Sequence, residues 1–263
     1  MWRRLTPLFL ASLLTASPVA ARHVHPLGDG WVRFEVAAAG RPLAAAMPSE
    51  LGTASPLVVV IEGDGAGHDR RGGAAPDPTP TRAVGLEIAR AWPGGAAWLA
   101  RPCQFVTDPA CRPADWTTSR FDARALAQMN AGLDALKARA GADRLILVGW
   151  SGGGVIAALA ARARSDVAGL VTLAAPLDVA AWTASRGFTP LSGLDPARLE
   201  APLNLPQVHA LGALDPVVRP QTARETARRW AGPRGQVVTW PERHDCCWTR
   251  RTHDLDARLK AQF

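Results

Sequence analysis

One serine in the sequence has neighbours that suit a nucleophile. The segment 149–153 reads Gly-Trp-Ser-Gly-Gly and matches the pattern G-x-S-x-G, with a run of Leu, Ile and Val before it and an Ala-rich run after it. Glycines beside the serine let a strand and a helix pass closely, which lifts the hydroxyl above a sheet. The first amides of that helix can stabilise a negative charge developing there. We therefore predict that Ser151 is a nucleophile rather than an incidental serine of a glycine-rich or phosphate-binding turn.

A serine hydroxyl needs a base within hydrogen-bond reach to attack at neutral pH, and the base needs an acid to orient it. Among the six histidines, only His244 falls in the loop after the last predicted strand, from which it can reach back over the sheet edge. We therefore predict His244 as the base rather than as a surface histidine. The others fall near the N-terminus, after a glycine-rich loop, inside a strand or in the last helix: His23, His25, His68, His209 and His253.

The acid has two candidates. Asp215 follows the strand that precedes the one leading to His244, in a loop stiffened by Pro216. The chain order Ser151, Asp215, His244 is an order in which such triads occur. Asp178, after the strand that follows the serine turn, is the competitor, and either aspartate could instead cap a helix or a turn. We favour Asp215 and leave Asp178 open.

Alternating strands and helices must bring these groups together. The continuous apolar runs 56–61 and 167–173 are typical of strands buried on both faces of a parallel sheet, and 122–140 carries the apolar stripe of an amphipathic helix. The β–α alternation predicts right-handed crossovers and a doubly wound sheet that binds ligands at the carboxyl ends of its strands. Segment 178–205 lacks a period and is predicted to be a small cap or insert. We also expect a hairpin at 31–46 with its turn at 40–42, strands at 96–100, 206–212 and 236–240, and helices at 81–91, 221–230 and 249–260.

Composition restricts the class of protein. The 263 residues fit one domain, and an apolar content of 48% is that of a globular protein. The net charge of +7 comes mainly from scattered arginines, since Lys137 and Lys260 are the only lysines, and this argues against nucleic-acid binding. No dinucleotide fingerprint or phosphate-binding loop is present, and the spacing around Cys246 is wrong for a zinc knuckle. We expect neither a cofactor nor a metal.

The N-terminus predicts export. Two arginines, the apolar run 5–16 and the small residues 19–21 form a signal peptide over 1–21, which leaves 22–263 as a single domain. The apolar run is too short to span a bilayer comfortably, and no cysteine near the cleavage point would carry a lipid. We therefore expect a periplasmic or secreted protein without a stable membrane anchor.

All four cysteines lie in the mature part, which suits an oxidising compartment. A bond between Cys103 and Cys111 would close a short loop and is the preferred pairing. The adjacent Cys246 and Cys247 could bond to each other, stay free or cross-link to the other loop.

With these features, the mature chain resembles the α/β-hydrolase superfamily. The turn around Ser151, the segment 212–216 and His244 carry the resemblance, and segments 101–105 and 244–248 suggest an exported bacterial branch. The resemblance implies a single-domain fold with a mostly parallel sheet flanked by helices, and a strand order that separates the two cysteine-bearing loops. It also implies an oxyanion hole made by the backbone amides of Gly152 and Asp64. Here Glu62 stands where the family usually has histidine, and Asp64 adds a second carboxylate.

The expected function is a serine hydrolase that cleaves a carboxylic ester or related acyl bond of a small molecule through an acyl-enzyme. A thioesterase or a peptidase would use the same groups, and a non-catalytic exported ligand-binding protein is the alternative from another class. The sequence indicates no partner protein.

Overall fold

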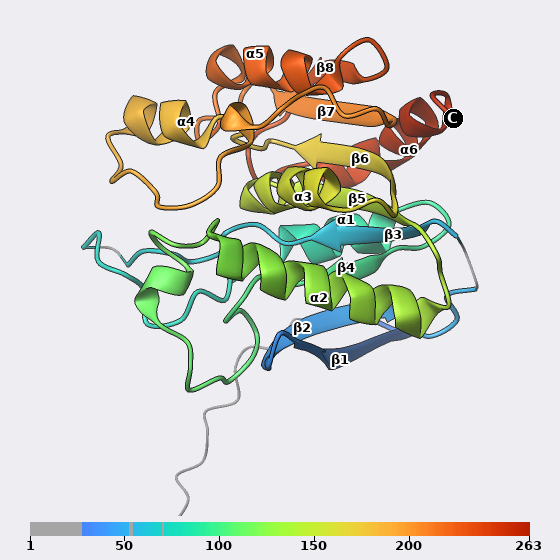
Figure 1. The fold of residues 1–263 in the computed structure, drawn as a ribbon, viewed down its shortest axis with the longest axis horizontal. Coiled ribbons are helices and arrows are strands. Elements are labelled where there is room, and N and C mark those ends of the chain that lie inside the picture. Colours follow the sequence, from blue (N-terminus) through green and yellow to red (C-terminus); the bar gives the residue numbers. More distant parts are fainter. Residues whose placement is uncertain (1–27, 53–54, 70) are drawn as a thin grey trace, which may run out of the picture.

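A computed structural model describes residues 28–263, apart from 53, 54 and 70. The predicted signal peptide at 1–21 lies outside the described residues, as do His23 and His25. The described chain forms one eight-stranded sheet with helices on both faces (Figure 1). This is the mostly parallel, helix-flanked sheet that the alternation of strands and helices predicts.

The strands lie in the order β1-β2-β4-β3-β5-β6-β7-β8, and only the pairings of β2 with its two neighbours are antiparallel. The carboxyl ends of β3 to β8 therefore meet at one edge of the sheet, where loops can assemble a site. The strand bounds are β1 Trp31–Ala38, β2 Arg41–Pro48, β3 Leu57–Ile61, β4 Ala97–Leu99, β5 Leu145–Trp150, β6 Val167–Leu173, β7 Gln207–Gly212 and β8 Gln236–Trp240.

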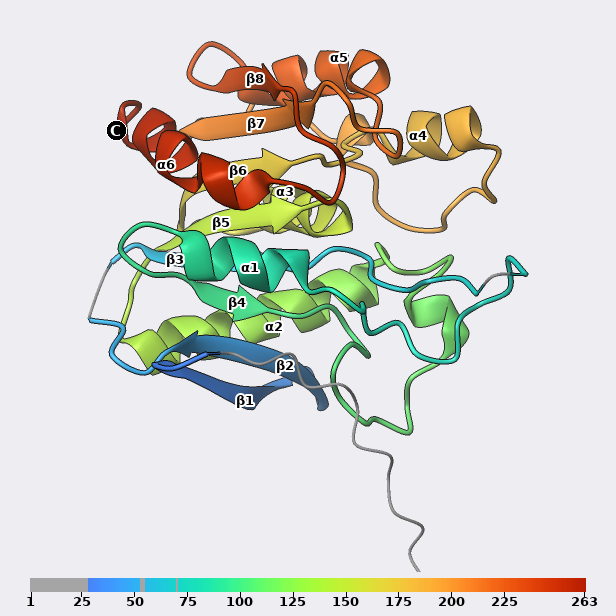
Figure 2. The ribbon, with the colours of Figure 1, turned by 180° about the vertical axis from the view of Figure 1, so that it is seen from behind.

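Helices cover the two faces of the sheet. Figure 1 shows α2 and α3 in front of the sheet, whereas α1 and α6 come forward when the molecule is turned round in Figure 2. Within the described part of the chain, no helix combines the length and apolarity needed to cross a membrane. The helix bounds are α1 Val84–Ala91, α2 Ala123–Ala140, α3 Gly152–Ala163, α4 Val179–Arg186, α5 Pro220–Ala231 and α6 Thr252–Lys260, with short 3₁₀ turns at Pro113–Asp115, Pro196–Arg198 and Trp248–Arg251.

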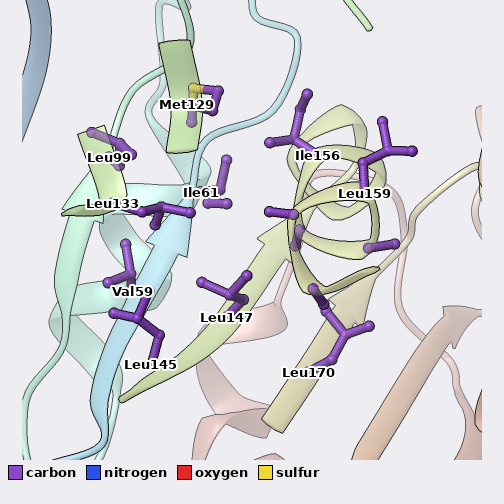
Figure 3. Close-up of a cluster of buried hydrophobic side chains, with 14 of the residues drawn as sticks. Val59, Ile61, Leu99, Met129, Leu133, Leu145, Leu147, Ile156, Leu159 and Leu170 are labelled. Carbon is purple, nitrogen blue, oxygen red and sulfur yellow. The ribbon is translucent and has the colours of Figure 1, made fainter. Parts of the chain in front are cut away.

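Alternate residues of each central strand enter different hydrophobic cores. In β3, Val59 and Ile61 pack toward α2 and α3, whereas Val60 packs toward α1 and α6. Figure 3 shows the first of these cores, where Leu147 of β5 lies among side chains from the sheet and from α3. Because both faces of these strands are buried, their sequences read as continuous apolar runs rather than as alternating ones.

Two local details differ from the sequence prediction. The hairpin turns at Ala39 and Gly40, whose φ angles of 50° and 80° suit a two-residue turn, and not at 40–42. The insert 178–205 contains a helix, α4, which the sequence pattern did not reveal. This helix has only eight residues, too few for an apolar period to emerge, and Gly187 ends it with a φ of 64°.

The four cysteines form two bonds. Cys103 and Cys111, the predicted pair, close a loop after β4, and Cys246 bonds to its neighbour Cys247 in the loop after β8. The vicinal bond is one of the three alternatives left open by the sequence. Neither sulfur of that pair is therefore a thiolate that could bind a metal.

A partly buried ion cluster joins α2 and α3 to the start of β6. Asp166 accepts hydrogen bonds from Arg164 Nε at 2.8 Å and from Lys137 Nζ, and its side chain is 20% exposed. Burial alone would raise the pKa of this carboxyl, but the hydrogen bonds and charges of Arg164 and Lys137 lower the pKa to about 2.

We predict that Asp166→Asn lowers the free energy of unfolding by about 1 kcal/mol at pH 7, after allowance for partial exposure. A depressed pKa stabilises the fold above the ordinary value of 3.8 and ceases to do so as the pH falls through about 2. Urea unfolding should therefore show a difference from wild type that is full at pH 7 and shrinks below pH 4. As a control, Glu200→Gln removes an exposed partner of Arg162 and should change little. A difference that persisted unchanged to pH 2.5 would contradict the prediction.

Candidate active site

Ser151 lies in the tight turn between β5 and α3, with φ at 53° and ψ at −125°. This is a strained conformation for a residue with a side chain. A Cβ on Gly149 would come within 2.3 Å of the Gly153 carbonyl oxygen, and one on Gly153 within 2.3 Å of the Ile61 oxygen. Glycine is therefore required on both sides of the serine, because any larger residue would force the strand and the helix apart.

The structure brings together the three residues selected from the sequence. Ser151 Oγ lies 3.0 Å from His244 Nε2, and His244 Nδ1 lies 2.8 Å from Asp215 Oδ2. The three residues follow β5, β8 and β7, whose carboxyl ends lie at the same edge of the sheet. The Asp215 side chain is fully buried and that of His244 is 13% exposed. The Asp215 carboxylate is therefore shielded from water, while the His244 ring reaches the surface.

The two candidate acids have different surroundings. Asp215 uses its second oxygen to accept hydrogen bonds from the amides of Val217 and Val218, at 2.7 and 2.8 Å, which fixes the carboxylate opposite His244. Asp178 instead caps α4, since its side chain accepts from the amide of Ala181 at 2.8 Å. The geometry therefore favours Asp215 as the partner of the histidine.

Two tryptophans hold the backbone of the histidine loop. Trp150 Nε1 and Trp248 Nε1 each donate to the carbonyl oxygen of His244 at 2.9 Å. The Trp150 ring also lies 5.3 Å from the His244 ring. Sequence reasoning missed this contact, because Trp150 occupies the unspecified position of G-x-S-x-G. The only signal was an aromatic residue with a donor directly beside the serine.

The loop after β3 packs against the first turn of α3. A Cβ on Gly63 would meet the Trp150 ring at 2.5 Å, and one on Gly153 would meet the backbone carbonyl oxygen of Glu62 at 2.5 Å. Gly152 begins α3, so its amide is among those that a helix leaves without an internal acceptor. The amides of Gly152 and Asp64, the predicted oxyanion donors, therefore lie on two segments in contact.

The side chain of Glu62 points away from this contact. Its buried carboxylate accepts from the amides of Gly63, Gly85 and Leu86 and from Trp98 Nε1, at 2.9 to 3.2 Å. Burial raises the pKa of Glu62, and these donors oppose the rise. Two of the amides belong to the first turn of α1, whose dipole favours a negative charge. Glu62 thus fixes the loop to α1 and does not direct its charge at the serine.

The Asp64 side chain turns toward Gly152 and meets two arginines. Arg101 Nη1 lies 3.1 Å from Asp64 Oδ1, and Arg120 Nε lies 2.9 Å from Asp64 Oδ2. Sequence reasoning did not assign a role to either arginine. Arg101 directly follows a predicted strand, which was a usable signal, whereas Arg120 lies in a polar loop that gave none.

The remaining described histidines lie elsewhere. His209 is buried in β7 with its Nδ1 atom 2.8 Å from Thr172 Oγ1, and burial lowers the pKa of His209 to about 3. Its ring is therefore neutral at physiological pH and is a buried part of the sheet. His68 and His253 are exposed. Among the described residues, no group of three or more His, Cys, Asp or Glu side chains is arranged to hold a metal ion.

No protein-family model and no curated protein sequence matches the chain. Solved structures match its fold. A puromycin hydrolase is 20% identical with a TM-score of 0.61, and the match covers 92% of this chain. An esterase of Pyrococcus furiosus is 14% identical with a TM-score of 0.61, covering 88% of this chain and 91% of the esterase. An α/β serine hydrolase homologue from Coxiella burnetii is 17% identical with a TM-score of 0.54, covering 88% and 96%.

The chain spans only 40% of the length of the puromycin hydrolase. At these identities the likeness concerns the fold. The eight strands in the order described, with β2 antiparallel and a glycine-flanked serine turn after β5, agree with that likeness. This chain has the α/β-hydrolase fold.

Proposed function

We propose that this protein is a serine hydrolase that cleaves a carboxylic ester or a related acyl bond. The observation that carries the proposal is the line of hydrogen-bond contacts from Ser151 through His244 to Asp215, built on a strained, glycine-flanked turn. The names of the structural neighbours, which include esterases and serine hydrolases, support a hydrolase.

In this mechanism, His244 donates its Nδ1 hydrogen to Asp215 and presents its Nε2 lone pair to Ser151. Ser151 Oγ attacks the acyl carbon as its proton passes to His244 Nε2. The amides of Gly152 and Asp64 then stabilise the negative oxygen, and Asp215 stabilises the imidazolium. His244 gives the proton to the leaving group, which leaves an acyl-enzyme on Ser151. A water molecule, deprotonated by His244, releases the acyl group and restores the serine.

The same groups would serve a thioesterase or a peptidase, so the acyl substrate is proposed only as a small molecule with a cleavable acyl bond. A protein that had kept the fold for ligand capture would not react with a serine-directed phosphonate. This reaction therefore separates the enzyme from the binding protein of the same fold.

We also propose that the mature protein works in an oxidising compartment, after removal of residues 1–21. The two disulfide bonds support this location. N-terminal sequencing of the protein exported by a bacterial host would test it, since cleavage after Ala21 leaves Arg22 as the first residue.

We predict that Ser151→Ala abolishes both labelling by a fluorophosphonate probe and hydrolysis of 4-nitrophenyl acetate, because no other described serine has the same base. The expected loss of kcat is about 10⁴-fold or more. Ser165→Ala, an exposed serine in the loop before β6, is the matched control and should label and turn over like wild type. Retention of full activity by Ser151→Ala would refute the proposal. A panel of esters of graded acyl length would then define the substrate class.

The triad acid is tested by a pair of asparagine variants. Asp215→Asn keeps the shape of the side chain but no longer holds the required tautomer of His244, so kcat should fall about 10³- to 10⁴-fold. Asp178→Asn retains a helix-capping side chain, so kcat should stay within about threefold of wild type. Steady-state kinetics on one ester checks both variants. The reverse order of losses would assign the acid to Asp178.

A further inference from the structure

A carboxylate touches the residue that follows the nucleophile. A Cβ on Gly152 would lie only 1.9 Å from Asp64 Oδ1 and 2.4 Å from Asp64 Cγ, so this side chain packs directly on the backbone of Gly152. The amide of Gly152 is a proposed oxyanion donor. An uncompensated negative charge at this position would oppose the negative charge that develops on the substrate oxygen.

Two buried arginines compensate this charge. The ion pairs of Asp64 with Arg101 and Arg120 are 3.1 and 2.9 Å long, and the arginine side chains are only 4% and 8% exposed. Two positive charges thus face one negative charge, and the group of three carries a net positive charge beside the oxyanion position. Because both arginines are buried, they act on the substrate through Asp64 and not by contact.

The arginines are themselves held in place. Arg101 Nη2 donates to the carbonyl oxygen of Arg120, and Arg120 Nη1 donates to that of Thr117 at 3.0 Å. The Phe121 ring lies 5.2 Å from the guanidinium carbon of Arg101 and 5.4 Å from that of Arg120. On the side of the insert, the Trp182 ring of α4 lies 5.8 Å from the Arg120 guanidinium.

The insert also pairs with this segment through the backbone. The amide of Ser192 donates to the carbonyl oxygen of Thr118 at 2.9 Å, and the amide of Leu194 donates to the carbonyl oxygen of Phe121 at 3.0 Å. The insert 178–205 therefore covers the arginine segment 117–121 and shields Arg120 from water, which strengthens its ion pair with Asp64.

We propose that Arg101 and Arg120 are positioning residues of the reaction, a role that rests on the serine hydrolase function proposed above. They neutralise Asp64 and hold the loop whose amide, together with that of Gly152, binds the oxyanion. Because the oxyanion exists only in the transition state and the intermediates, the arginines contribute to kcat and leave KM nearly unchanged.

The test uses charge changes at two positions. Arg120→Met keeps an apolar stem against Phe121 and Trp182 but leaves Asp64 with one cation, so kcat for 4-nitrophenyl acetate should fall at least tenfold with KM within about threefold. Arg120→Lys keeps the charge and should recover most of the loss. Adding Asp64→Asn to Arg120→Met removes the charge that needs compensation and should restore kcat about tenfold.

The control is Arg124→Met, which removes an arginine that pairs with Asp115 and is 60% exposed. Its kcat should match wild type. Wild-type kcat in Arg120→Met would overturn the proposal. So would a double variant Asp64→Asn/Arg120→Met whose fold-loss of kcat equals the product of the losses in Asp64→Asn alone and Arg120→Met alone, because the two residues would then act independently.

Thermal unfolding of each variant separates loss of fold from loss of rate. If Arg120→Met does not fold, the neutral pair Asp64→Asn/Arg120→Gln is measured instead. Its kcat should stay within about tenfold of wild type, and a hundredfold loss in a folded protein would overturn the proposal. Phosphonate labelling of wild type tests the hydrolase function separately. A wild type that does not label overturns that function, whereas a reactive wild type with an insensitive Arg120 overturns only the positioning role.

Discussion

The site depends on the close approach of three backbone segments at one point of the molecule. The end of β5, the first turn of α3 and the end of β3 meet where a Cβ on Gly149 or Gly153 would overlap carbonyl groups. This contact sets the left-handed conformation of Ser151, places the serine directly before the first turn of α3 and brings the loop after β3 alongside. Rigid strands on both sides, buried in two cores, maintain the contact, so the geometry at the serine is a property of the whole sheet.

Three carboxylates lie close to this point, and each has a separate set of hydrogen-bond or ion-pair partners. Asp215 is held by the amides of the loop after β7, Glu62 by the start of α1 and Asp64 by two arginines. On the proposed mechanism the site stabilises an anion, and these partners explain how such a site can contain so many acids. Only Asp215 directs its carboxylate at His244, which carries a positive charge in the proposed mechanism. The other two charges are turned away or compensated.

The alternation of apolar runs was enough to predict the mostly parallel sheet, because strands buried on both faces have a distinctive composition. The order of Ser151, Asp215 and His244 at successive strand ends was likewise enough to select the residues that the structure brings together. The contact between Trp150 and the His244 carbonyl could not be predicted, since it joins residues 94 positions apart through a side chain that the motif leaves free. The pairing of Asp64 with Arg120 could not be predicted either, because Arg120 lies in a polar loop whose course depends on the insert. The eight-residue α4 was missed because its stability comes from a capping aspartate and from packing, not from a period.

The placement of His244 has a consequence for the order in which the chain acquires its chemistry. Ser151 follows a strand in the middle of the sheet, whereas His244 follows β8, an edge strand, and the two residues are 93 positions apart. Contacts of such long sequence separation cost the most chain entropy to close. On the proposed mechanism, a chain whose last strand has not yet paired carries a serine without its base and is chemically silent. Hydrolytic activity would therefore report that the C-terminal strand has docked, and a growing or half-folded chain could not attack acyl bonds before it is complete.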